Sequence, residues 1–165
     1  MKKILRIVLC IVLCFVLFSC GEQNKKIETD ASDIPVINKD NVHKFDSIAN
    51  FKSAVKKDAE KYENMQVSVK GSILKNNGKI VIIENQLTEE QLTSINSGGE
   101  FSIRHSREKI IEQSIHMVVI IPNDKKVAIL DDGDYVEIYG TVKISNTGIY
   151  LDSCDYEMIQ SVYEQ

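Results

Sequence analysis

Apolar and polar residues follow two different periods along this chain, and the period changes near Met65. Between Asn41 and Tyr62 the apolar residues recur at intervals of three, four and seven, with lysine and aspartate between them. The apolar positions are Val42, Phe45, Ile48, Val55, Ala59 and Tyr62. This spacing predicts an amphipathic helix with one core-facing side, and Asp46 or Ser47 could cap a shorter version of it.

From Met65 onward the period is two, which predicts β-strands. Met65–Ile73 alternates, Asn76-Asn77-Gly78 has the residues of a tight hairpin, and Lys79–Glu84 returns as a second strand. Three further strands are predicted at His116–Ile121, Tyr135–Ile144 and Ile149–Met158. Turns containing Gly133 and Gly148 lead into the last two of them.

Two strands carry the same pattern with a glycine at the fifth place. They are VSVKGSI at Val67–Ile73 and VEIYGTV at Val136–Val142, and Gly71 and Gly140 share the phase of the valines. A glycine inside a strand weakens it, so a geometric reason is expected, such as a sharp bend or bulge. Closing five strands into a barrel requires such bends and removes the sheet edges.

The first 18 residues have the composition of a secretory signal. Lys2, Lys3 and Arg6 precede an apolar run of 12 residues, Ile7–Phe18. A membrane-spanning helix needs about 20 apolar residues, whereas a basic segment before a shorter apolar run is typical of a signal peptide.

The sequence Leu17-Phe18-Ser19-Cys20 resembles the bacterial lipobox, although Phe18 is bulkier than usual. The resemblance implies cleavage before Cys20, diacylglycerol on its thiol, and acylation of the new amino terminus, for example with palmitate. Two or three acyl chains are enough for stable anchoring in a membrane. The alternatives are a plain signal peptide with a buried cysteine and an uncleaved anchor.

The predicted organisation has three parts. Residues 1–19 are the signal peptide, and residues 20–40 are the lipidated cysteine and a flexible tether, whose reach is about 25 Å. Residues 41–165 form the helix and a β domain, with a long insertion at about 85–115 between the second and third strands. The chain would then be an extracytoplasmic protein held on the cell membrane or outer membrane through Cys20.

Processing also changes the cysteine and charge counts. The whole chain carries a net charge of −4; loss of three basic residues leaves 17 basic against 24 acidic, or −7. Cys154 is then the one free thiol, so an intramolecular disulfide is not expected. A bulge near Asp152-Ser153 would turn Cys154, Tyr156 and Met158 to the same side as Ile149 and Leu151, which predicts a buried, unreactive thiol.

The order of these features resembles the tRNA-anti-like group of OB-fold domains over residues 43–160. The resemblance is carried by the helix ending at Tyr62, V-x-V-x-G-x-I from Val67, the run Leu130-x-x-Gly133-Asp134-x-Val136-x-Ile138-x-Gly140-x-Val142, and Leu151-x-x-Cys154. It implies a mainly β fold, a five-stranded OB-fold Greek-key barrel preceded by an amphipathic N-terminal helix. The insertion departs from the family pattern, and the family implies no agreed biochemical role.

Three function classes can be compared on the residues. Oligonucleotide binding is the first alternative, with Tyr135, Tyr139 and Tyr150 as candidate stacking residues. Between Tyr62 and Gln165, however, 9 basic residues face 16 acidic ones, which opposes binding to a polyanion. Lys70, Lys79, Arg104 and Arg107 are the basic residues that such binding would have to use.

An envelope enzyme is the second alternative. His43, His105 and His116 have no partner at triad or zinc-site spacing, and Asp131-Asp132-Gly133-Asp134 lacks the downstream glutamate of a calcium loop. The sequence therefore predicts no catalytic residue, metal or cofactor. It predicts a binding or interaction module whose partner is a protein or an envelope component such as a saccharide.

Overall fold

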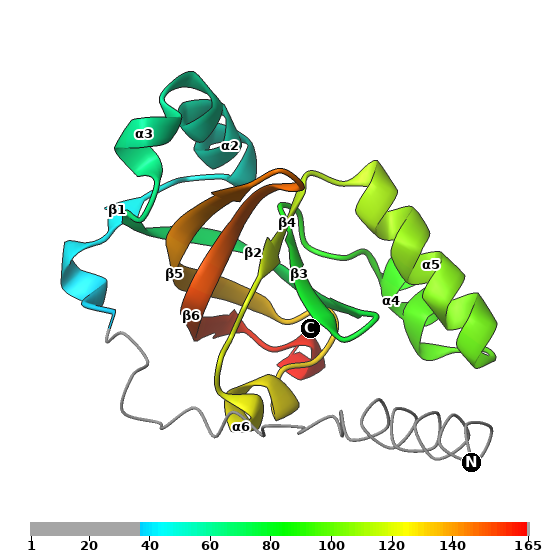
Figure 1. Cartoon of the computed structure of the whole chain (residues 1–165). Coiled ribbons are helices and arrows are strands. Elements are labelled where there is room, and N and C mark those ends of the chain that lie inside the picture. The colour runs from blue at the N-terminus through cyan, green and yellow to red at the C-terminus, as the bar shows by residue number, and fades with distance from the viewer. Residues whose placement is uncertain (1–36, 165) are drawn as a thin grey trace, which may run out of the picture. The chain divides into compact units, whose positions relative to one another are not determined.

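The structure is a computed structural model that describes residues 37–164 (Figure 1). The predicted signal peptide, Cys20 and most of the predicted tether lie outside these residues. Strands make up most of the fold: β1 His43–Lys44, β2 Gln66–Asn76, β3 Lys79–Ile83, β4 His116–Val119, β5 Tyr135–Ser145 and β6 Gly148–Gln160. The helices are α2 Ile48–Lys57, α3 Ala59–Tyr62, α4 Glu89–Asn96, α5 Glu100–Gln113 and α6 Asp124–Ala128, with short 3-10 helices at Lys39–Asn41 and Val162–Glu164.

The six strands form one mixed sheet that curls into a partial ring. The order is β1-β2-β3-β4-β6-β5, and β5 also pairs with β2, so the five longer strands follow one another in a circuit. The joint between β4 and β6 is parallel and short, with one register pair, Val119 opposite Leu151. Two backbone hydrogen bonds of Ile120 extend this joint. The N–H of Ile120 donates to the carbonyl of Leu151 at 2.9 Å, and the N–H of Cys154 donates to the carbonyl of Ile120 at 2.8 Å.

The prediction of five strands is wrong by one. The additional strand, β1, comes from the start of the predicted Asn41–Tyr62 helix, and it pairs in parallel with Val67 and Ser68. The helix proper begins only after Ser47, whose Oγ accepts a hydrogen bond from the N–H of Asn50 at 3.1 Å. Glu84 adds a second cap, because its Oε2 accepts from the N–H of Ala49 at 2.6 Å.

The predicted helix is also interrupted at Asp58. Its φ of −149° and ψ of 76° end α2, and its carboxylate caps α3 by accepting from the N–H of Lys61 at 3.2 Å. The core side of α2 is confirmed, because Ile48 and Val55 are buried, together with Phe51. Phe45 packs against this core from the segment before the helix.

The strands and hairpins otherwise follow the predicted pattern. β2 and β3 are joined by Asn77 and Gly78 at φ values of 50° and 73°, the left-handed conformations that a two-residue hairpin needs. β5 and β6 are joined at Asn146-Thr147, with Gly148 at φ 132°. The mainly β class is therefore confirmed.

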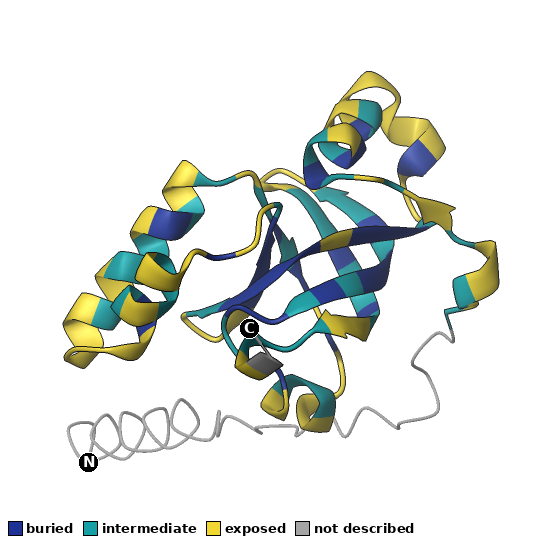
Figure 2. Ribbon diagram, turned by 180° about the vertical axis from the view of Figure 1, so that it is seen from behind, coloured by how far each residue is buried: buried dark blue, intermediate teal, exposed yellow. Residues whose placement is uncertain are grey.

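The insertion at about 85–115 forms two helices, α4 and α5, which lie side by side (Figure 1). They cover the outer face of β2 and β3 and create a second core. Its buried members are Leu74, Val81, Ile83, Leu87, Ile95 and Ile110. Burial on both faces explains why Figure 2 shows long buried stretches in β2 and β3.

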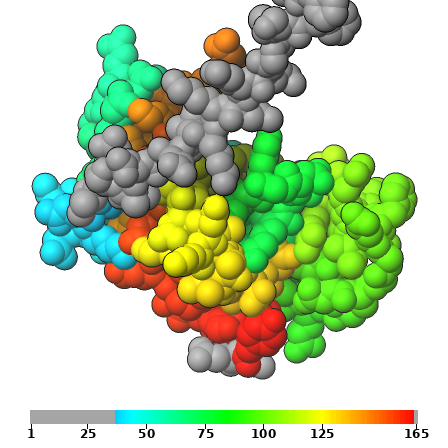
Figure 3. All heavy atoms as spheres, turned by 60° about the horizontal axis from the view of Figure 1, so that its bottom comes forward, coloured from blue at the N-terminus to red at the C-terminus, as the bar shows by residue number. Residues whose placement is uncertain are grey.

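Arg107 of α5 fastens the insertion to the segment that leads into β5. Its guanidinium lies 2.5 Å from Oδ2 of Asp132, and Oδ1 of the same carboxylate accepts from the N–H of Lys75. Figure 3 shows the yellow-green spheres of α5 beside that segment. The Asp132 side chain is nearly buried, so the ion pair is shielded from water.

Gly71 and Gly140 are required by close approach between strands. A Cβ on Gly71 would lie 2.6 Å from the carbonyl oxygen of Ile83, and one on Gly140 would lie 2.6 Å from Sγ of Cys154. Contacts below about 3 Å do not occur at real Cβ atoms, so any side chain there would push two strands apart. Close approach is therefore the geometric reason for a glycine at each of these two positions.

The predicted bulge is present in β6. Tyr139 opposes Asp155 and Thr141 opposes Asp152, so Gly140 alone faces two residues, Ser153 and Cys154. Ser153 has a φ of 52°, and the bulge turns Cys154 into the main core, where it is 4% exposed. The prediction fails at Met158, which is 43% exposed although it lies opposite the buried Val136; the second register irregularity comes only after it, between Met158 and Gln160.

Candidate functional site

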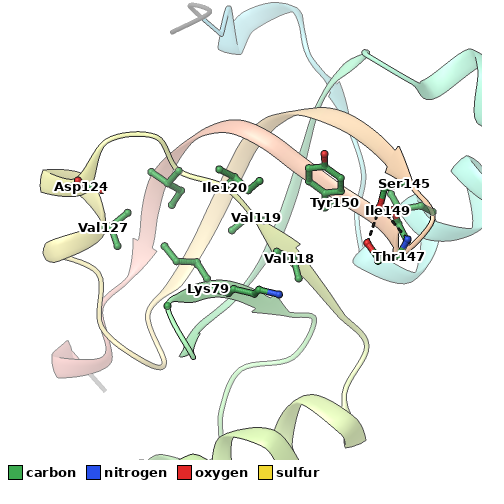
Figure 4. A pocket seen from close by; sticks show the side chains of 14 residues that line it. Lys79, Val118, Val119, Ile120, Asp124, Val127, Ser145, Thr147, Ile149 and Tyr150 are labelled. Atoms are coloured by element: carbon green, nitrogen blue, oxygen red, sulfur yellow. Dashed lines mark hydrogen bonds between the residues drawn. The ribbon is translucent and has the colours of Figure 1, made fainter. Parts of the chain in front are cut away.

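A groove of about 630 Å³ opens between the two hairpin turns and helix α6 (Figure 4). Four separate segments line it: the start of β3, the end of β4 and the residues after it, α6, and the β5–β6 turn. The lining residues are Gly78, Lys79, Ile80, Val118, Val119, Ile120, Ile121, Asp124, Val127, Ser145, Thr147, Gly148, Ile149 and Tyr150. Its volume lies within the range of small-molecule sites in proteins.

Local sequence signals hold each wall of the groove in place. Pro122 follows the end of β4, and Asn123 starts α6 by accepting hydrogen bonds from the N–H groups of Lys125 and Lys126 at 3.0 and 3.3 Å. The hydroxyl of Tyr156 donates to the carbonyl of Lys126 at 3.0 Å and so ties α6 to β6. The groove is therefore bounded by tight turns and a capped helix.

The groove surface is mostly apolar and carries little net charge. Ile80, Val119 and Ile121 form buried parts of it, and Ile120 is 46% exposed beside them. Val127, Ile149 and Tyr150 are half-buried. Lys79 and Asp124 are the charged residues of the lining and have opposite signs. Such a surface suits a neutral ligand that offers apolar area and a few hydrogen-bonding groups.

Of the three predicted stacking tyrosines, Tyr150 reaches the groove. Tyr139 is buried under Lys39, whose Nζ lies 4.9 Å from the ring centre, and its hydroxyl donates to Glu157 Oε2 at 3.1 Å. Burial and this hydrogen bond raise the pKa of Tyr139. Tyr135 lies at the other end of β5, opposite Gln160. The three rings therefore do not form a stacking platform.

The four basic residues considered for nucleic acid are also separated. Arg107 is engaged by Asp132, and Arg104 lies 3.4 Å from Glu108 on the same helix. Lys70 lies with Glu137 around a smaller hollow. Lys79 is the member of this set that borders the groove.

The three histidines considered for catalysis or metal binding lie on different elements of the fold. His43, His105 and His116 lie on β1, α5 and β4 respectively. Within residues 37–164 no group of three histidine, cysteine or acidic side chains is arranged to hold a metal ion.

The aspartates of the turn before β5 have structural partners. Asp134 is buried and accepts hydrogen bonds from the N–H groups of Asp131 at 2.7 Å and Val162 at 2.9 Å. Asp132 binds Arg107 and the backbone of Lys75. Gly133 has the predicted positive φ, 99°. The carboxylates of Asp132 and Asp134 therefore stabilise the fold at this turn.

Cys154 is buried as predicted. Burial, together with the nearby charges of Asp152 and Asp155, raises the pKa of its thiol to about 12, although the hydrogen bond to Ile120 opposes this. A thiol with that pKa is protonated near neutral pH and is a poor nucleophile. Cys20, the predicted site of lipidation, lies outside the described residues.

Three acidic residues on β5 and β6 are matched by lysines from other segments. Lys39 lies 3.1 Å from Glu157 and 3.3 Å from Asp155, and Lys126 also bonds Asp155. Lys44 lies 3.8 Å from Glu137. Burial would raise the pKa of Asp155, but the hydrogen bonds from Lys126 and the Tyr156 N–H, with Lys39 nearby, lower it. The acidic charge of these strands is thus partly neutralised within the fold.

Comparisons with protein-family models, with curated proteins and with solved structures find no match. Among the described residues, the helices are all too short or too polar to cross a membrane. The groove residues Ile120 and Val127 were not among the sequence candidates. Ile120 was included in the predicted strand His116–Ile121 but lies just beyond the end of β4, and Val127 belongs to a short helix, α6, that no periodic signal predicted.

Proposed function

We propose that this chain is a lipid-anchored, extracytoplasmic OB-fold module of the tRNA-anti-like kind, and that its groove binds a neutral envelope component or a segment of a partner protein. The pairing order supports the fold assignment. With β1 set aside, the fourth strand, β5, returns beside the first, β2, and the fifth lies between the third and fourth. A fourth strand that returns beside the first is the mark of a Greek key.

The position of the groove is the observation that carries the proposal. OB-folds bind their ligands on the second and third strands, between the loops that join strands one and two and strands four and five. In the circuit of five strands these correspond to β3, β4, the Asn77-Gly78 turn and the Asn146-Thr147 turn. The groove is lined by β3, β4 and residues of both of these hairpins.

Charge favours a neutral ligand over an oligonucleotide. Lys79 is the one basic residue of the groove lining that could contact the phosphates of an oligonucleotide, and the negative charge of Asp124 in the same lining would repel them. A nucleic-acid groove needs several basic residues along the backbone path, because phosphate neutralisation supplies most of the affinity. Fluorescence anisotropy with labelled single-stranded DNA and RNA discriminates between the two: submicromolar binding that weakens steeply with salt would favour the nucleic-acid alternative.

Photo-crosslinking in intact cells tests the ligand site directly. A photoreactive amino acid at Ile120 or Tyr150 should capture a discrete adduct, while the same residue at Phe101 should not. Phe101 is a matched control because it is 81% exposed but lies on α5, outside the groove lining. Identical adducts at all three positions, or none at the groove positions, would contradict the proposal.

The anchor is tested separately. Cys20→Ala should abolish acylation and either release the chain or leave an unprocessed precursor, since the lipobox cysteine is the proposed acceptor. Metabolic labelling with a fatty acid and membrane fractionation measure this. A variant that is still processed and acylated would show that Cys20 is not the lipidated residue.

A further inference from the structure

A second hollow lies between helix α2 and the β5–β6 turn. Its volume is about 360 Å³, and it is lined by Lys52, Val55, Lys56, Ala59, Ile144, Ser145, Gly148 and Ile149. Four of these residues are aliphatic, two are lysines, and none is acidic. This composition differs from that of the groove, which contains one charge of each sign.

The two lysines have no counter-charge within residues 37–164. Lys39, Lys44 and Lys126 form ion pairs with acidic side chains, whereas Lys52 and Lys56 form neither an ion pair nor a side-chain hydrogen bond there. Lys52 and Lys56 are one helical turn apart, so their side chains project from the same face of α2. Burial and the charge of Lys56 lower the pKa of Lys52, which is the response of a cation that lacks an anionic neighbour.

Apolar residues line the hollow together with the two lysines. Val55 is buried between them on the helix, and Ile144 and Ile149 face them from the hairpin arms and are half-buried. An inorganic anion would satisfy the lysines but leave the aliphatic walls in water. A purely apolar ligand would cover the walls but bring two cations closer to low-dielectric surroundings, which is unfavourable.

We infer that this hollow binds an anionic amphiphile, with a carboxylate or phosphate head between Lys52 and Lys56 and an unbranched alkyl chain against Val55, Ile144 and Ile149. Both parts of the ligand are needed: charge-assisted hydrogen bonds hold the head, and apolar burial holds the chain. The site is distinct from the groove and does not rest on the function proposed for it, although the two hollows share Ser145, Gly148 and Ile149.

Isothermal titration calorimetry tests this on the chain from residue 20 to 165 carrying Cys20→Ser, which removes any acyl group that could compete. Decanoate or decyl phosphate, kept below the micelle concentration, should bind at one saturable site and weaken with added salt. Acetate and inorganic phosphate supply the head alone, and decanol supplies the chain alone. Each of these three should bind at least tenfold more weakly.

Substitutions locate the site. Lys52→Gln with Lys56→Gln should weaken decanoate binding at least tenfold, and Lys57→Gln should not change it, because Lys57 is exposed on the same helix outside the lining. Ile120→Asp is a second control: it disrupts the groove alone and should leave decanoate binding intact. Equal binding of decanol, or unchanged binding in the double variant with an unchanged thermal midpoint, would overturn the inference.

Discussion

Replacement of Gly140 by alanine tests how tightly β5 and β6 are packed at the bulge. The added Cβ would lie 2.6 Å from Sγ of Cys154, 3.0 Å from Cβ of Leu151 and 3.3 Å from the carbonyl oxygen of Asp152. Cys154 and Leu151 are both buried in the main core, so neither can move into solvent. Overpacking of this kind costs about 1–3 kcal/mol, and Gly140→Val, which is bulkier, should cost at least as much.

A double-mutant cycle separates the steric clash from other effects of the substitution. Cys154→Ala removes the sulfur and leaves a small cavity; in its presence Gly140→Ala should lose less stability, with a coupling of about 0.5–2 kcal/mol. Rescue should be partial, because the contact with Leu151 Cβ remains.

Urea unfolding followed by circular dichroism measures the free energy of unfolding for each variant. Gly99→Ser is the matched control: a Cβ there meets nothing within 4 Å, and serine is a favourable residue at this helix N-cap. The control should be neutral or stabilising. An unchanged midpoint for Gly140→Ala, or additive effects of Gly140→Ala and Cys154→Ala, would refute the close-packing argument.

Three other predictions concern stability. Gly71→Ala should destabilise the fold by about 1–3 kcal/mol, and no side-chain truncation should rescue it because the clash is with the carbonyl oxygen of Ile83; a variant as stable as the parent in urea would contradict this. Arg107→Gln should cost about 1–3 kcal/mol because it leaves the nearly buried carboxylate of Asp132 without its cation; Arg104→Gln on the same helix, more exposed and paired only with Glu108, should change the unfolding midpoint little. The pKa of Asp155 is lower in the folded protein than in the unfolded chain, so the unfolded chain binds a proton at this carboxyl more readily. The contribution of Asp155 to the free energy of unfolding is therefore complete above about pH 4 and disappears as the pH falls through the folded-state pKa. Thermal unfolding from pH 7 to pH 2 measures this, and Asp155→Asn should flatten the acid limb; a limb of equal slope in both proteins would assign the acid sensitivity to other carboxylates.

Local patterns in the sequence determined the features that depend on neighbouring residues. Alternation located the five longer strands, and Asn77-Gly78 marked the first hairpin because those residues tolerate left-handed backbone. The paired glycines pointed to close packing, and the phase break after Leu151 pointed to a bulge that buries Cys154. Each of these signals can be read within a single strand or turn, where backbone geometry and side-chain period are directly linked.

The interruption of the first helix depended on tertiary contacts. The apolar spacing from Asn41 to Tyr62 is compatible with one helix, yet His43 and Lys44 pair with β2 instead. Glu84, which is distant in sequence, caps the helix that begins after Ser47. A strand edge and a carboxylate brought in by folding therefore decided where the helix starts.

The insertion and the two hollows were decided by the tertiary structure alone. α5 contributes one buried residue, Ile110, so its own period is weak; the apolar surface that it covers belongs to β2 and β3. The groove joins four segments between Gly78 and Tyr150, and the second hollow joins α2 to the β5–β6 turn. In the sequence, the spacing of Lys52 and Lys56 indicates only the solvent-exposed side of a helix. They line a hollow with Ile144 and Ile149 because the fold places the β5–β6 turn next to α2.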